Sequence, residues 1–182
     1  VYAAGRVSTE LPALLDRIVD PRRPLTIVFG RVQGGVAFNV IPTSVELGGT
    51  VRTLDPELWS EIPMLLESLA SQIVAPIGAK ATVSHQTGIP PVVNDPGVID
   101  VARVAIAEAL GPQAVTSTDT SMGAEDFSRY LEHVPGALLR LGSAPDHGMS
   151  DLHSAGFVFN EAALDTGLVA GAATLLRLLA AG

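Results

Sequence analysis

Cysteine is absent from the 182 residues of this chain. Its absence excludes disulfide bonds, a thiolate nucleophile and cysteine-ligated zinc within these residues, and it leaves His, Asp and Glu as the possible metal ligands. Aromatic residues are also scarce, at 4% of the chain. Hydrophobic residues nevertheless make up 47%, which is enough to build a buried core. The composition therefore predicts a globular protein rather than a disordered one.

Basic residues are few, because 11 Lys and Arg stand against 19 Asp and Glu, for a formal net charge of −8. Binding to a phosphate backbone requires clustered positive charge, so we expect no nucleic-acid partner. We find no apolar run that approaches the roughly 20 residues needed to cross a bilayer, and no signal-peptide pattern. We therefore expect no membrane partner and a cytoplasmic location. The chain opens at Val1 within a helical pattern and without an initiator Met, which indicates a missing upstream portion.

The first half of the chain predicts an element order of helix, strand, strand, helix and strand. This order matches a ferredoxin-like split βαββαβ domain that lacks its first strand, and we assign it to residues 1–87. The predicted segments are a helix at 1–19, strands at 25–33 and 45–53, a helix from Asp55-Pro56 to about Ile77, and a strand at 81–87.

The second half begins after Gly88-Ile89-Pro90-Pro91, since two prolines favour an extended connector. It has too few strands to close a sheet alone, so we predict that residues 88–182 are half of an α/β domain. The predicted segments are a helix at 98–110 capped by Asn94-Asp95-Pro96, strands at 115–118 and 137–142, a short helix at 123–131, a polar loop at 143–151 and a last helix from Asn160 or Glu161 to Leu178.

Four histidines are available as metal ligands or catalytic groups. His85 lies in a predicted strand and His133 at a helix end, and we interpret both as surface or packing histidines. His147 and His153 share the polar loop with two aspartates, which leaves a self-contained metal site in that loop as one possibility. Their spacing fits no regular element, so the residues alone do not favour a local site.

Four motifs stand in a fixed order along the chain: FGRVQGGVAFNVIP at residues 29–42, GTVRTLD at 49–55, MGAEDFSRYL at 122–131 followed by Val134-Pro135-Gly136, and Leu152-His153-Ser154. The first two resemble the lid domain of the metal-dependent amidohydrolases of the aminoacylase, hippurate hydrolase and carboxypeptidase superfamily. The last two resemble the C-terminal catalytic segment of its hippurate hydrolase and auxin-conjugate hydrolase branch. The resemblance covers essentially the whole chain.

The resemblance implies that residues 1–87 are a lid and dimerisation domain, and that residues 88–182 are the C-terminal half of a zinc-peptidase-like catalytic domain. It implies hydrolysis of an N-acyl amino acid or a similar amide with a free carboxylate, two divalent metal ions, zinc or manganese, and a homodimer formed through the lid. Most metal ligands would lie outside this chain. We therefore expect the chain alone to bind no metal tightly and to be inactive.

The same resemblance assigns roles to four residues. His153 matches the last metal ligand in the chain, and Glu125 matches a group that lies near the substrate pocket. Asn39 and Arg52 match lid residues that reach toward the partner's active site, where an amide can donate to an oxyanion and a guanidinium can bind a carboxylate. No catalytic residue is assigned with certainty within this chain.

Each assignment has a structural alternative. The four alternatives are that Asn39 caps a turn before Ile41-Pro42, that Arg52 pairs with Glu46 or Asp55 on a strand face, that Glu125 is an acid at a helix N-terminus, and that His153 is a solvated loop residue. For the chain as a whole, the alternative is a non-catalytic dimerisation or binding module.

Overall fold

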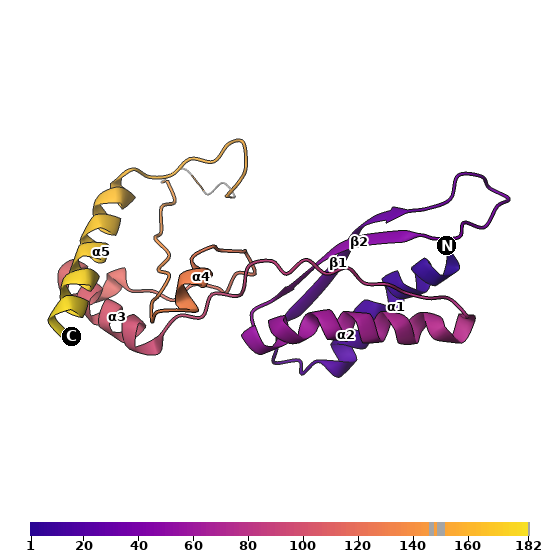
Figure 1. Ribbon diagram of the computed structural model, residues 1–182. Helices are drawn as coiled ribbons and strands as arrows, with labels where there is room; N and C mark the ends of the chain where they lie inside the picture. Colours follow the sequence, from indigo (N-terminus) through magenta and orange to yellow (C-terminus); the bar gives the residue numbers. More distant parts are fainter. Residues whose placement is uncertain (146–147, 149–151, 182) are drawn as a thin grey trace. The chain divides into compact units, whose positions relative to one another are not determined.

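The computed structural model describes residues 1–145, 148 and 152–181. These residues divide into two compact units, of which the first contains Val1–Pro91 together with Met122–Glu125. The second contains Val92–Ser121 and the described residues that follow Asp126. Figure 1 shows α1, α2, β1 and β2 in the first unit and α3, α4 and α5 in the second.

The first unit contains a two-stranded antiparallel sheet and two helices. Leu25 lies opposite Thr53 in the sheet and Gln33 lies opposite Glu46. These elements confirm the first four predicted segments, and the helices tolerate their internal prolines. Their bounds are α1 (Tyr2–Ile18), β1 (Leu25–Gln33), β2 (Glu46–Thr53) and α2 (Pro56–Val74), followed by the short 3-10 helix η1 (Ala75–Ile77).

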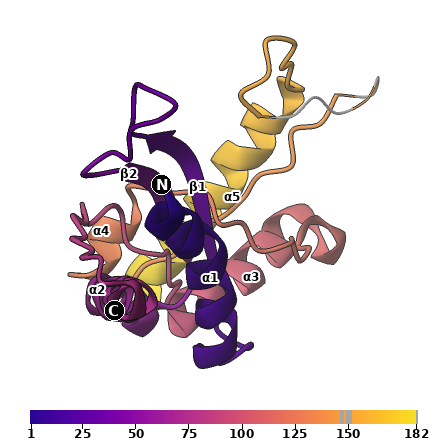
Figure 2. The ribbon, with the colours of Figure 1, turned by 90° about the vertical axis from the view of Figure 1, so that its right-hand side faces the viewer.

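The core of the first unit lies between the two helices and one face of the sheet, an arrangement visible in both ribbon views (Figures 1 and 2). Alternate strand residues such as Leu25, Ile27 and Phe29 pack against it because successive side chains in a strand point to opposite faces. The buried residues recur at helical spacing. They are Leu11 and Leu15 of α1 and Leu58, Ile62, Leu66, Leu69, Ile73 and Val74 of α2.

Helices α2 and α3 (Pro96–Leu110) both begin with an Asp-Pro pair. The carboxylate of Asp55 accepts the backbone N–H of Leu58 at 2.8 Å, and that of Asp95 accepts the N–H of Val98 at 2.9 Å. Asp and Pro favour this position because Asp satisfies a free N–H and Pro has none to satisfy. The structure confirms both predicted helix starts.

Asp55 also binds Arg23, which lies in the turn between α1 and β1. The Arg23 Nε and Nη2 atoms donate to the two carboxylate oxygens at 2.7 and 2.8 Å. The hydrogen bonds from this guanidinium and, to a smaller extent, from the N–H of Leu58 together lower the pKa of the Asp55 carboxyl from 3.8 to about 2. In the described part of the chain, Asp95 has no ion pair.

The second unit is built on the packing of α3 against α5 (Ala162–Ala181). Glu108 of α3 and Arg177 of α5 form an ion pair between the two helices. The unit also contains the 3-10 helix η2 (Pro112–Ala114) and α4 (Ser128–Leu131). Among its described residues, the buried side chains are small: Ala102, Ala105, Ser128, Ala163 and Thr174.

Helix α5 is long and apolar enough, over Ala162–Ala180, to cross a membrane by length and composition. This finding corrects the expectation that no segment of the chain reaches that length. The helix carries Asp165 and Arg177, and Arg177 pairs with Glu108. Since core helices of soluble proteins pass the same test, α5 alone is weak support for a membrane span.

Three predicted strands, at residues 81–87, 115–118 and 137–142, do not form in the described part of the chain. A strand is defined by the neighbour with which it pairs, and these segments lack one. Ala79, Ala81 and Val83 do pack against the first core in alternation, as strand residues would. The structure thus shows a mixed α/β chain with one small sheet among the described residues, and the ferredoxin-like form of residues 1–87 stays a prediction.

Candidate functional site

Asn39 lies in the loop that joins β1 to β2. The loop turns through Gly35, whose φ of +81° belongs to the left-handed region that glycine adopts freely, and Val40 N–H donates to the carbonyl of Ala37 at 3.4 Å. The side chain of Asn39 is exposed and has no hydrogen bond to the residues that the structure describes. Its predicted alternative role as a turn cap is therefore not seen.

Large apolar side chains surround Asn39 and point into solvent. Val36, Phe38, Val40 and Ile41 are between 61% and 112% exposed. A cluster of this kind at the tip of a hairpin is unusual for a surface that only meets water. We call residues 34–45 the hairpin loop.

Arg52 lies on the outer face of the sheet and binds the backbone of a distant segment. Its Nη1 atom donates to the carbonyl of Met122 at 3.2 Å. The two acids that were predicted as alternative partners of Arg52 pair with other arginines: Glu46 pairs with Arg31, and Asp55 pairs with Arg23. The alternative reading of Arg52 as a strand-face charge with those two acids is therefore wrong.

Asn39 and Arg52 lie toward opposite ends of the hairpin. β2 begins at Glu46 beside the hairpin loop, and six residues of strand, about 20 Å, separate Glu46 from Arg52. The hairpin itself thus does not bring the amide and the guanidinium together.

Glu125 lies in the Met122–Glu125 segment that belongs to the first unit. The predicted helix at 123–131 is shorter than expected, since α4 begins at Ser128. Glu125 precedes that first helical residue, so it does not lie in the first turn of the helix as its structural alternative supposed. The segment reaches the sheet through Arg52, and this contact brings two of the four predicted site regions together.

His153 lies in a turn and is exposed. Its φ is +70°, and among the described residues it is the one non-glycine residue with a positive φ. Such a conformation is uncommon outside glycine and often marks a functional constraint. Because the strand predicted at 137–142 does not form in the described part of the chain, His153 does not lie at a strand edge. His147, Asp146 and Asp151 lie outside the described residues.

His153 alone does not make a metal centre. Across residues 1–145, 148 and 152–181, no group of three or more His, Asp or Glu side chains is placed to hold a metal ion. Since a protein metal site needs three or four ligands in defined geometry, the described residues do not fit a two-metal centre by themselves. His85 and His133 are exposed, as expected of surface histidines.

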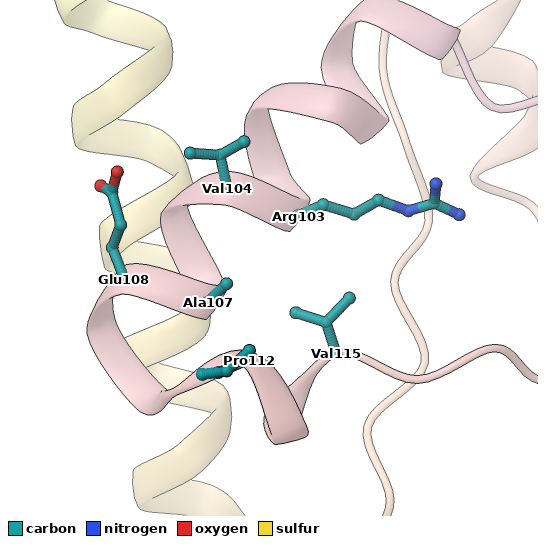
Figure 3. Close-up of a pocket in the computed structure, with 6 residues that line it drawn as sticks. All are labelled: Arg103, Val104, Ala107, Glu108, Pro112 and Val115. Atoms are coloured by element: carbon teal, nitrogen blue, oxygen red, sulfur yellow. The ribbon is translucent and has the colours of Figure 1, made fainter.

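A separate hollow of about 520 Å³ opens on the second unit (Figure 3). It is open and mainly apolar, and it contains none of the predicted site residues. Its lining comes from α3, η2 and the residue that follows η2: Arg103, Val104, Ala107, Glu108, Pro112 and Val115. We therefore do not place the candidate site there.

Sequence reasoning missed Thr26, whose hydroxyl contacts the sulfur of Met122 at 3.6 Å. Thr26 and Met122 are 96 positions apart, and neither residue type signals chemistry by itself. Only the alternation of β1, which puts Thr26 on the same face as Arg52, could have pointed to it.

The family model described as Peptidase family M20/M25/M40 matches residues 11–181. A probable hydrolase of Synechocystis is 38% identical, over 93% of this chain and 44% of the relative. The N-acetyl-L-cysteine deacetylase of Bacillus subtilis is 32% identical, over 90% of this chain and 38% of the relative. The IAA-amino acid hydrolase ILR1-like 2 of Arabidopsis thaliana is 29% identical, over 98% of this chain and 42% of the relative.

A similar fold has been solved in Bacillus subtilis. That structure, a dinuclear metal binding peptidase from the M20 family, matches with a TM-score of 0.79 and 31% identity, over 97% of this chain and 45% of that one. The chain thus spans about two fifths of the length of the curated relatives it matches.

Proposed function

The chain belongs to peptidase family M20/M25/M40, as its motifs predicted, and from this premise we propose that it supplies the C-terminal part of a metal-dependent amide hydrolase. The proposed substrate is an N-acyl amino acid or a similar amide that bears a free carboxylate. The observation that carries the proposal is the family match over residues 11–181, which includes every predicted site residue. Two of the relatives, an N-acetyl-L-cysteine deacetylase and an IAA-amino acid hydrolase, support the substrate class.

Arg52 is our candidate for binding the substrate carboxylate. One of its N–H groups is used by Met122, and the guanidinium has further N–H donors that can bind a carboxylate in a planar fork. Asn39 is our candidate donor to the oxyanion, because an exposed amide without a local partner is free to meet a ligand. Given their separation along the hairpin, we propose that Asn39 acts toward the site of a second copy.

His153 is our candidate metal ligand, through a neutral imidazole nitrogen. Two divalent metal ions, zinc or manganese, would supply Lewis-acid activation of the carbonyl and of the attacking water. The left-handed backbone at His153 supports this role, since strain of that kind persists where a side chain must be aimed. The remaining ligands would come from residues outside this chain.

Replacement of His153 by Ala in the complete protein tests the proposal. We expect metal content to fall and turnover to drop by orders of magnitude with the fold intact, because a ligand is lost. His147→Ala is the matched control in the same loop and should be much milder. Metal content by mass spectrometry and turnover on N-acetyl amino acids are the measurements. Equal effects of the two substitutions, or full metal occupancy without His153, would refute the assignment.

We further propose that the chain by itself hydrolyses no N-acyl amino acid above background, with or without zinc or manganese. The reason is that a metal site needs three or four ligands, and among the described residues no group of three or more His, Asp or Glu is placed to hold a metal ion. Chelator-sensitive turnover by the pure chain would contradict this and would favour a local site that includes His147.

We also propose a homodimer formed through the first unit. The exposed apolar side chains of the hairpin loop and the free edge of β1 are surfaces that a second copy could cover. Light scattering over a concentration series tests this, and a monomer at high concentration would count against it.

A cytoplasmic location, with neither nucleic acid nor membrane as a partner, completes the proposal, and cell fractionation would test it.

The second candidate function is a non-catalytic dimerisation or binding module. The exposed hairpin loop and the lack of a three-ligand cluster among the described residues favour it. The complete protein distinguishes the two, because a module would bind partners yet show no metal-dependent turnover.

A further inference from the structure

A short segment of the chain returns to the first unit after a long excursion. Met122–Glu125 belongs to that unit, whereas the residues on either side of it belong to the second. The segment lies within the MGAED motif and ends at Glu125, a predicted substrate-pocket residue. Its attachment to the sheet therefore decides where the start of that motif is held.

Two side chains of the sheet contact Met122 in this segment. Arg52 Nη1 donates to the Met122 carbonyl at 3.2 Å, and Thr26 Oγ1 contacts the Met122 sulfur at 3.6 Å. Thr26 and Arg52 are direct partners in the register of β1 and β2. Directly opposed residues of an antiparallel pair lie on the same face, so one cross-strand pair holds both the backbone and the side chain of Met122.

The pair lies on the face of the sheet that points away from the core. Leu25 and Ile27, the neighbours of Thr26, pack inward, as does Val51 beside Arg52. Thr26 and Arg52 are exposed, so neither is needed to fill the core of the unit. Their contacts with Met122 are therefore separate from the packing that forms the core of the first unit.

We propose that Arg52 and Thr26 form a clamp on Met122, which holds the start of the MGAED motif against the sheet, and that Arg52 combines this contact with its role as a candidate substrate ligand. The role of Arg52 toward substrate rests on the proposed function, whereas the clamp itself does not. The clamp couples the sheet that carries the hairpin loop to the segment that carries Glu125. A ligand that binds the other N–H donors of Arg52 would therefore bind a residue that is already hydrogen-bonded to Met122.

Lysine separates the two roles of Arg52. A lysine ammonium can donate one hydrogen bond to the Met122 carbonyl, but it cannot form the planar fork that binds a carboxylate in two places. Arg52→Lys should thus keep the clamp and lose the fork, whereas Arg52→Leu should lose both. Arg31→Leu is the matched control, because Arg31 lies on the same strand pair and binds Glu46 instead.

The methionines of the chain provide the measurement. Only three are present, Met64, Met122 and Met149, so a spectrum of the intact 182-residue chain with carbon-13-labelled methionine methyls has one signal for each. Met64 lies exposed on α2 and provides the reference signal of a methionine without tertiary packing, while far-UV circular dichroism reports whether each variant is folded. A Met122→Leu variant assigns the signal that matters.

We expect the Met122 methyl signal to move toward the position of free methionine in Arg52→Leu, and to move less in Thr26→Val. It should stay in place in Arg52→Lys and Arg31→Leu, with Met64 unmoved in all four variants. Amide exchange over residues 122–125 should rise about fivefold in Arg52→Leu, the size expected for one lost hydrogen bond.

An unmoved Met122 signal in Arg52→Leu would overturn the clamp, and so would an equal shift in Arg31→Leu. A shift in Arg52→Lys as large as in Arg52→Leu would contradict a clamp in which Arg52 acts through one hydrogen bond to the Met122 carbonyl. Because these spectra use no substrate, their failure is distinct from the failure of the proposed amide hydrolysis.

Discussion

The two units of this chain use the same helix signals but bury very different side chains. α2 and α3 both begin with a capping Asp and a Pro, at almost the same hydrogen-bond distance. Eight Leu, Ile and Val side chains form the core of the first unit. The buried side chains among the described residues of the second unit are three Ala, one Ser and one Thr.

The difference shows that helix signals and core formation are separate properties of a sequence. α5 presents its larger side chains to solvent, and Leu168, Leu176 and Leu179 are each 68% to 72% exposed. Burial of apolar surface is the main favourable contribution to folding. We therefore expect the first unit to be the more stable one, and the apolar faces of the second to need a cover that the described residues do not provide.

The largest effect should come from a core residue of the first unit. Leu58→Ala removes a side chain that is 1% exposed, so unfolding of that unit should become easier by about 2 to 5 kcal/mol. Leu168→Ala in α5 removes the same atoms from a side chain that is 72% exposed and should change stability by about 0.5 kcal/mol or less. Urea unfolding followed by circular dichroism measures both. Similar losses would show that the two units do not differ as described.

A smaller effect should separate the two Asp-Pro helix starts. Asp55→Ala removes a helix cap and the partner of Arg23, whereas Asp95→Ala removes a cap alone. We expect the melting temperature of the first unit to fall by roughly 5 °C in Asp55→Ala. Asp55→Asn, which keeps a capping side chain but loses the charge, should fall between Asp55→Ala and the unchanged chain. If Asp55→Asn matches Asp55→Ala, the ion pair and not the cap dominates.

The smallest effect should appear in acid. Folding lowers the pKa of Asp55 from 3.8 to about 2. The ionised carboxylate therefore stabilises the folded chain fully at pH values above about 4. That contribution should be lost as the pH falls from about 4 toward 2. In Asp55→Asn the stability of the first unit should depend less on pH over this interval. Urea midpoints at several pH values measure it, and parallel curves for the two proteins would contradict the assignment.

Local signals were enough to predict the regular elements of the first unit. Helical spacing and the Asp55-Pro56 start predicted α2, a segment rich in Ile, Val and Phe predicted β1, and alternation predicted β2, because each signal lies within a few residues of its effect. The strands predicted at 81–87, 115–118 and 137–142 do not form in the described chain. A strand depends on a neighbour that its own residues do not specify.

The candidate site depended even more on distant contacts. The motifs named Arg52 and Glu125, but the 70-position contact of Arg52 with Met122 could not be read from them. The pairing of Arg23 with Asp55, 32 positions apart, could likewise not be predicted from the motifs. Asp55 was therefore considered as an alternative partner of Arg52. The Leu152-His153-Ser154 motif named His153 as a candidate metal ligand, and its left-handed backbone became apparent only in the structure.

Amide hydrogen exchange on the 182-residue chain tests the central contrast most directly. Exchange follows local opening, which costs most where apolar burial is greatest. We expect slow exchange for the amides of α2 and β1 and exchange faster by orders of magnitude for those of α3 and α5. Equal protection of the amides of α2 and α3 would contradict this contrast, because the second unit would then be as stable as the first although its buried side chains are small.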